Sequence, residues 1–327
     1  RKQLYMAYNT KTSKGDDNDN QENIKKIVNN RLEMAQIMGR SHYSEYRLER
    51  TMAQADSSVY GLLDDLHAKY MPHAIKEREL IAEYAKKLNN DPNFTLMPYD
   101  WAYYSEKYKE EKYAYKEEDL KPYFELERVK KGVFGLATDL YGIKFVPNKE
   151  LPVYHKDVDL FEVYDADDKF MGLLYTDFFP RKSKRQGAWM TEFKGQYYNA
   201  DGTDSRPLIS LVMNFTPPTG DGPALLTFEE VKTFLHEFGH ALHGLLSDVP
   251  YESLSGTNVY RDFVELPSQI MENFASLPEF LNKTAIHYQT GEVIPTELVE
   301  KVKASEQYLA AYSCIRQLSF GYLDMAW

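Results

Sequence analysis

The sequence contains a single cysteine, Cys314, among its 327 residues, and one cysteine excludes an internal disulfide framework. No apolar run approaches the roughly 18 residues of a membrane span, so we predict no transmembrane helix. No signal peptide follows Arg1. The single cysteine fits a reducing compartment, and we favour the cytoplasm. The periplasm stays open, because we expect the natural N-terminus to lie upstream of Arg1.

Positive charge is also scarce. Lysine and arginine total 39 against 50 aspartates and glutamates, which leaves a net charge of −11. Proteins that bind nucleic acids use clusters of lysine and arginine on phosphates, so we predict no nucleic-acid partner. Residues 99–124 are rich in aromatic side chains with interleaved lysines, but neighbouring glutamates cancel that charge. We therefore interpret these aromatic residues as packing between helices. For the oligomeric state, which the sequence leaves unknown, we favour a monomer.

The hydrophobic pattern changes twice along the chain. Amphipathic patterns predict helices that begin near Asn20 or Asn23 and others over 51–70, 72–89 and 128–141. Alternating or branched segments at 151–177 and 208–215 predict strands of a small, mostly antiparallel sheet, and helical patterns return from Thr227. The fold class is therefore mainly α with a small antiparallel β-sheet insert. The helical pattern from Arg316 to Trp327 has no stop signal, so we expect a piece of a longer protein.

One helical segment carries a pattern that points to chemistry. Thr227 and Glu230 form a capping box that predicts the start of a helix. On this helix the apolar side chains share one arc, while His236, His240 and His243 share a stripe on another side. Two imidazoles one turn apart can ligate a single cation. The alternative is a helix whose polar face happens to carry histidines.

The residues between the first two histidines extend the pattern to His-Glu-x-x-His. Glu237 lies beside the histidine stripe, too far around the helix to join both imidazoles as a ligand. That position suits a general base that takes the proton of a metal-bound water. Gly239 keeps the helix slim beside the site, at a cost of about 1 kcal/mol in helix propensity against alanine.

A catalytic zinc site needs a third protein ligand and one open position. Two known spacings are excluded, because Leu246 and Tyr260 occupy the positions where those classes of zinc protease place their third ligand. The next acidic residues, Asp262 and Glu265, are the candidates. They belong to a second predicted helix that starts just before Pro267. Its polar stripe also includes Gln269 and Glu272, and its apolar stripe contains Phe263, Leu266, Ile270 and Phe274. Asp262 and Glu272 could instead cap the helix, face solvent or orient the ligands.

The sequence resembles the thimet oligopeptidase family of zinc metallopeptidases, the M3 group. The resemblance rests on the segments 236–243, 254–257 and 261–273, with further similarity at 120–124, 140–143 and 211–216. It implies a zincin-like, mainly helical fold and one Zn²⁺ ion. The implied metal ligands are His236, His240 and Glu265, with Glu237 as the catalytic base.

The resemblance also implies a function. Within the family, the run from Ser255 to Glu265 is most similar to the bacterial peptidyl-dipeptidases, which release dipeptides from the C-termini of short unstructured peptides. The alternatives are an oligopeptidase that cuts internally and an inactive fragment that binds zinc and peptide. Residues 1–145 would form part of a channel wall, and residues 146–327 would form the catalytic zinc region of one continuous fold.

Overall fold

The computed structural model describes residues 1–113, 116–218, 220 and 222–327. Tyr115, in the aromatic-rich segment, and Asp221 lie outside the described residues. The chain divides into two compact units. The first unit combines Arg1–Ala114 with Lys303–Trp327, and the second comprises Tyr115–Val302. None of the helices in the described part of the chain has both the length and the apolar character to cross a membrane.

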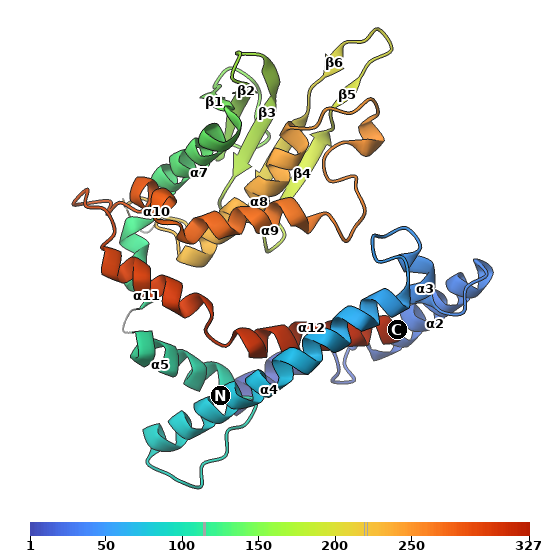
Figure 1. Ribbon diagram of the computed structural model, residues 1–327, viewed down its shortest axis with the longest axis vertical. Helices are drawn as coiled ribbons and strands as arrows, with labels where there is room; N and C mark the ends of the chain where they lie inside the picture. The colour runs from blue at the N-terminus through green and yellow to red at the C-terminus, as the bar shows by residue number, and fades with distance from the viewer. Residues whose placement is uncertain (114–115, 219, 221) are drawn as a thin grey trace. The chain divides into compact units, whose positions relative to one another are not determined.

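The first unit is helical. Its helices are α1 (Lys2–Asn9), α2 (Gln21–Ile37), α3 (Tyr43–Leu48), α4 (Asp56–Asn89), α5 (Trp101–Tyr113) and α12 (Ala310–Ala326). Helices α4 and α12 lie side by side although they are far apart in the sequence (Figure 1). The Glu77 carboxylate on α4 accepts hydrogen bonds from the backbone N–H groups of Ala311 and Tyr312 at the start of α12. These contacts tie the end of the chain to its first half.

The two helices predicted at 51–70 and 72–89 are a single helix, α4, with Pro72 inside it. A proline in a helix interior removes one backbone hydrogen bond and costs about 3 kcal/mol. The helix continues because its neighbours compensate: α12 packs along it, and Ile81 and Ala85 are fully buried with Tyr104 of α5. The prediction of two separate helices was therefore wrong.

The second unit contains the sheet. Its strands are β1 (Lys144–Pro147), β2 (Val158–Tyr164), β3 (Phe170–Asp177), β4 (Trp189–Lys194) and β7 (Leu208–Val212), in the spatial order β1-β2-β3-β7-β4. A separate two-stranded sheet joins β5 (Tyr197–Tyr198) and β6 (Asp204–Ser205). Strands β3 and β7 pair in parallel and the other pairs are antiparallel, so the sheet is mixed rather than purely antiparallel. The long connection through β4 to β6 lets β7 return in the direction of β3.

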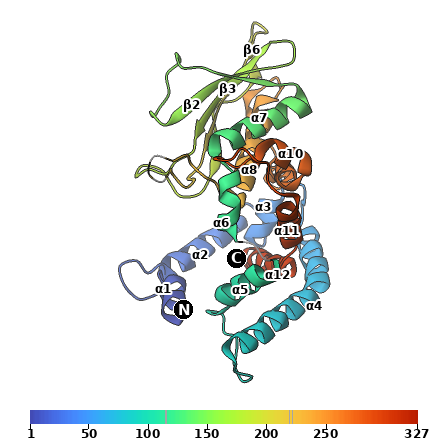
Figure 2. The same ribbon diagram turned by 90° about the vertical axis from the view of Figure 1, so that its left-hand side faces the viewer.

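Helices complete the second unit. They are α6 (Glu117–Leu120), α7 (Leu126–Tyr141), α8 (Phe228–Leu245), α9 (Glu265–Glu272) and α10 (Pro278–Thr284), with short 3₁₀ turns at Lys121–Tyr123, Glu252–Leu254 and Asn273–Ser276. Helix α11 (Thr296–Glu306) spans the boundary between the units. Figure 2 shows α7 and α8 beside the strands. Phe134 of α7, Phe145 of β1 and Phe238 of α8 pack with their rings in contact.

The mainly helical class with a small sheet is confirmed, and helix starts predicted near Asn20 and Thr227 occur at Gln21 and Phe228. The compact second unit begins at residue 115, upstream of the division at 146 made from the sequence. The reason is that α7 packs against α10 and the first strand. The channel-wall role of residues 1–145 stays a prediction.

Candidate metal centre

Helix α8 starts where the capping box places it. The Thr227 hydroxyl accepts the Glu230 backbone N–H at 3.1 Å, and the Glu230 carboxylate accepts the Thr227 N–H at 2.8 Å. Its apolar side is fully buried, with Val231, Phe234, Leu235, Phe238, Ala241 and Leu245 at 0% exposure. Burial of this side fixes the rotation of the helix. The histidine stripe is consequently held in one orientation against the next helix, α9.

His236, His240 and Glu265 come together between α8 and α9. One carboxylate oxygen of Glu265, Oε2, lies 3.2 Å from Nε2 of His236 and 3.1 Å from Nε2 of His240. Ligands at the roughly 2.0–2.1 Å bond lengths of tetrahedral zinc lie about 3.3 Å apart. Within the described residues this is the one group of three or more potential ligands whose donor atoms converge, all within 4.8 Å.

The hydrogen bonds of His236 favour a cation at this point. Its Nδ1 lies 2.7 Å from Oε1 of Glu272. An Nδ1–H that donates to this carboxylate leaves a lone pair on Nε2, which then faces the acceptor oxygen of Glu265. Two acceptors facing each other require a cation or a further proton between them. The donor set of two imidazoles and one carboxylate fits Zn²⁺, so His236, His240 and Glu265 are the residues that would hold it.

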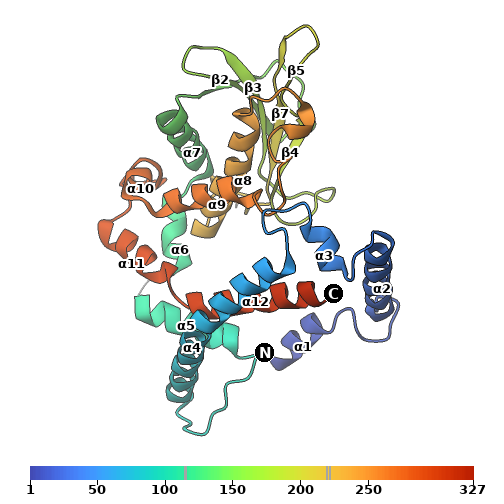
Figure 3. The ribbon, with the colours of Figure 1, turned by 45° about the vertical axis from the view of Figure 1, so that its right-hand side comes forward.

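Gly239 allows α9 to approach. A Cβ atom built on Gly239 would lie 2.6 Å from the carbonyl oxygen of Pro267 and 2.6 Å from Cα of Ser268. Figure 3 shows α8 and α9 crossing. Helix α9 begins at Glu265, so Pro267 lies in its first turn as predicted. The backbone contact at Gly239 therefore sets how far the first turn of α9, with Glu265, can approach the histidines.

The other face of α9 differs from the sequence interpretation. Leu266 and Ile270, assigned to an apolar stripe, are 49% and 50% exposed. The buried residues of this helix are Ser268 and Met271. Ser268 donates a hydrogen bond of 2.8 Å to the Glu265 carboxylate. Sequence reasoning missed Ser268, although its position three residues after Glu265 on a helix places the two side chains together.

Glu237 is buried beside the histidines, with 7% exposure. Burial raises the pKa of its carboxyl to about 7, and the backbone N–H of Met190 on β4 opposes that shift in pKa. It lines a pocket of about 300 Å³ that also contains His236 and Glu272. The Glu237 carboxylate therefore lies beside the group formed by His236, His240 and Glu265 and is not one of its donors, as the helix geometry predicted.

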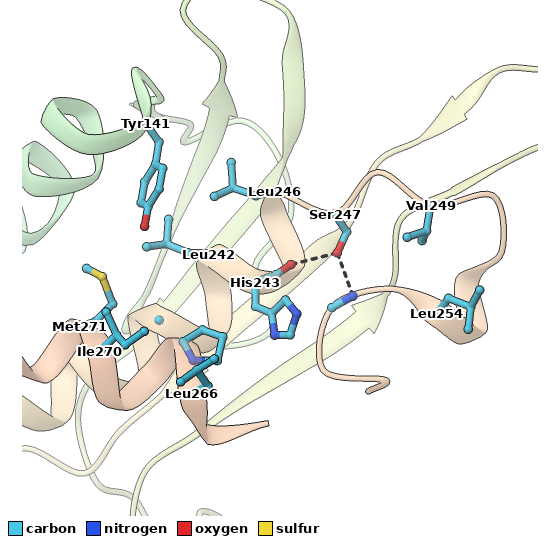
Figure 4. Close-up of a pocket in the computed structure, with 13 residues that line it drawn as sticks. Tyr141, Leu242, His243, Leu246, Ser247, Val249, Leu254, Leu266, Ile270 and Met271 are labelled. Carbon is cyan, nitrogen blue, oxygen red and sulfur yellow. Dashed lines mark hydrogen bonds between the residues drawn. The ribbon is translucent and has the colours of Figure 1, made fainter. Parts of the chain in front are cut away.

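His243 is separated from the cluster. Its side chain lines a different pocket of about 470 Å³ between the second half of α8 and α9 (Figure 4). The walls are mostly apolar and include Leu242, Leu246 and Leu266. Burial lowers the pKa of His243, and its ring lies edge-on to Phe263. The three histidines of the predicted stripe thus divide into a converging pair and a third in an apolar environment.

Two histidines one turn apart on one helix, a glutamate from the next and a second glutamate beside them form the donor set of a zincin-type metal site. The chain belongs to Peptidase family M3, which it matches over residues 1–327. This confirms the resemblance drawn from the motifs. M3 peptidases are metallopeptidases, and the His-His-Glu group is a site where a metal can bind.

Relatives of two specificities are about equally similar. The chain is 38% identical to a dipeptidyl carboxypeptidase of Escherichia coli, aligned over 100% of this chain and 47% of the relative. It is 39% identical to oligopeptidase A of the same organism, over 99% of this chain and 48% of the relative. A thimet-like oligopeptidase of Dictyostelium discoideum is 33% identical, over 90% and 46%. The chain therefore spans about half the length of these relatives.

Proposed function

We propose that this chain provides the zinc-binding, catalytic part of an enzyme that hydrolyses short peptides. The observation that carries the proposal is the convergence of His236, His240 and Glu265 on one point, with Glu237 buried beside it. Membership of Peptidase family M3 and the peptidase names of the relatives support it. Zn²⁺ is the proposed ion because two imidazoles and a carboxylate are a common catalytic zinc ligand set.

The roles of the residues follow from their positions. A bound divalent ion would polarise a peptide carbonyl and make water acidic enough to act as a nucleophile near neutral pH. Glu237 accepts the proton of the attacking water and delivers it to the nitrogen of the departing amine. Glu272 holds the His236 ring through Nδ1, so that Nε2 points at the metal position.

The proposed specificity is release of dipeptides from the C-terminus. It is supported by the run from Ser255 to Glu265, which resembles the peptidyl-dipeptidases of the family. The name of one E. coli relative, dipeptidyl carboxypeptidase, fits this specificity. The name oligopeptidase A of the other keeps internal cleavage as the second candidate. Product analysis with a peptide of six or more residues separates them: dipeptides appear successively from the C-terminus in the first case, and internal fragments in the second.

The experiment that tests catalysis is Glu237→Gln, measured for both metal and turnover. Gln keeps the size of the side chain but cannot accept a proton, so kcat should fall by about 100-fold or more. The zinc content should stay at one equivalent, because Glu237 is not among the converging donors. A Glu237→Gln protein with full activity would exclude Glu237 as the base. Stoichiometric zinc without any peptidase activity in the wild-type protein would favour a binding module.

A further inference from the structure

Two pockets flank the His236–His240–Glu265 cluster, and they differ in charge. The apolar pocket in Figure 4 is lined by Tyr141, His243, Ser247 and surrounding aliphatic residues, and none of the lining residues is an acid, lysine or arginine. The second pocket, here called the polar pocket, is lined by Ala188, Glu229, Lys232, Thr233, His236, Glu237 and Glu272. A substrate that ends in a carboxylate would lose its hydration in the apolar pocket without a partner.

Lys232 is the one cation among the described residues that line the polar pocket. Its side chain is 29% exposed, and its nearest acidic partner, Glu229, lies 3.9 Å away, beyond hydrogen-bonding distance. Glu229 is itself 76% exposed, and an ion pair of that kind contributes at most about 1 kcal/mol. Exchange of Glu229 for a closer anionic partner would therefore cost little free energy.

The carboxylates of the polar pocket do not compete strongly for Lys232. Glu272 is engaged by Nδ1 of His236 at 2.7 Å. Glu237 is buried and receives the backbone N–H of Met190. The remaining acid, Glu229, is the exposed partner already described. An anionic group that enters the pocket consequently meets one ammonium that has no close partner among these three carboxylates.

The position of Lys232 along α8 suits the end of a dipeptide. It precedes His236 by one helical turn, a rise of about 6 Å along the helix axis. Two extended residues beyond a cleaved bond span about 7 Å. The span of a leaving dipeptide is thus close to the separation of Lys232 and His236 along the axis of α8. Longer leaving segments would carry their carboxylate beyond it.

We propose that Lys232 binds the C-terminal carboxylate of the peptide substrate in the polar pocket and thereby sets release of dipeptides. The inference rests on the proposed peptidase function, because it assigns the pocket to the leaving end of the substrate. It makes Lys232 a specificity-determining residue. It predicts that a free C-terminal acid is recognised and that the corresponding amide is not.

Equilibrium binding tests the inference independently of turnover. Zinc-loaded Glu237→Gln protein, in its full natural length, is titrated with a pentapeptide in its free-acid and C-terminally amidated forms. We expect the acid to bind about tenfold or more tightly than the amide, since charge-assisted hydrogen bonds are the strong ones. Adding Lys232→Met should remove that preference, and Lys232→Arg should retain it. Zinc content and Tm are measured for each protein to verify that the fold and the site are intact.

Lys301→Met is the matched control. Lys301 also forms an ion pair within a helix and is 32% exposed, close to the 29% of Lys232, but it does not line the polar pocket. Its loss should leave the preference for the acid unchanged. The inference is overturned if the Glu237→Gln protein that retains Lys232 binds the acid and the amide equally. It is also overturned if the preference for the acid survives Lys232→Met. Peptidase activity measured in parallel on the Glu237 wild-type protein reports separately on the proposed function.

Discussion

Gly239 of α8 and Ser268 of α9 meet at the point where the two metal-binding helices cross: a Cβ on Gly239 would lie 2.6 Å from Cα of Ser268. The contact is between backbones, so no rotamer change can relieve it. The distances among His236, His240 and Glu265 thus depend on Gly239, a residue that has no side chain and takes no part in the chemistry.

Gly239→Ala should push α9 away from α8. Overpacking of this kind costs about 1–3 kcal/mol, which exceeds the gain of about 1 kcal/mol in helix propensity. We expect a lower free energy of unfolding together with weaker zinc binding, measured by denaturant titration and competition with a chelator. Gly135→Ala is the control, because that glycine lies inside α7 with nothing within 4 Å of a Cβ. It should be neutral or slightly stabilising, and equal losses in both variants would contradict the prediction.

Glu265→Ala should abolish stoichiometric zinc binding, because it removes the oxygen that lies 3.2 Å and 3.1 Å from the two imidazole nitrogens. His240→Ala should do the same. Asp262→Ala provides the comparison, since the sequence left both acids open as the third ligand and only Glu265 belongs to the converging group. Elemental analysis of the three purified variants decides the question. Zinc lost from Asp262→Ala and kept by Glu265→Ala would reverse the assignment.

Glu272→Ala should weaken zinc binding by about 10- to 100-fold without abolishing it, as expected for a residue that orients a ligand. The reason is that Glu272 accepts a hydrogen bond from Nδ1 of His236 at 2.7 Å. Glu272→Gln keeps an acceptor oxygen in the same place and should recover most of the affinity. Chelator competition gives both values. A Gln variant as weak as the Ala variant would show that charge, rather than orientation, is the contribution of Glu272.

Glu192 on β4 should make the free energy of unfolding depend on pH. Burial, with a smaller contribution from Glu252, raises the pKa of its carboxyl from 4.5 to about 7. Since the folded protein holds this proton more tightly, the stabilisation is complete below pH 4.5 and is lost as pH rises to about 7. One carboxyl oxygen, Oε1, is buried without a hydrogen-bond partner in the described part of the chain.

Glu192→Gln should remove this dependence on pH. Above pH 7 its free energy of unfolding should be higher than that of the wild type, by less than about 3 kcal/mol. Denaturant titrations at pH 5 and pH 8 measure it. Glu279→Gln, which changes an exposed acid in the first turn of α10, is a control for the loss of one charge. An unchanged difference between the two pH values in Glu192→Gln would assign the dependence to other groups.

Local sequence patterns were sufficient to predict the class of fold and most residues of the candidate metal centre. The capping box at Thr227, the buried arc of α8 and the pair His236 and His240 are properties of a single helix, and a helix has a fixed period. The position of Pro267 in the first turn of α9 followed in the same way from the restriction that proline imposes, whereas the start at Glu265 itself, rather than at Arg261, did not. Each of these predictions involves residues within a few turns of one another.

Contacts between distant segments decided the rest. The family resemblance named Glu265 as the third ligand, but spacing by itself could not choose between Asp262 and Glu265, because the choice depends on how closely α9 approaches Gly239. Nor could it show that α4 continues through Pro72, that Leu266 and Ile270 are exposed, or that His243 lies in an apolar pocket. Sequence periodicity specifies which residues share a face of an element. Which face is covered, and by what, depends on the packing of segments that are distant in the chain, because burial of apolar surface is a property of the whole fold.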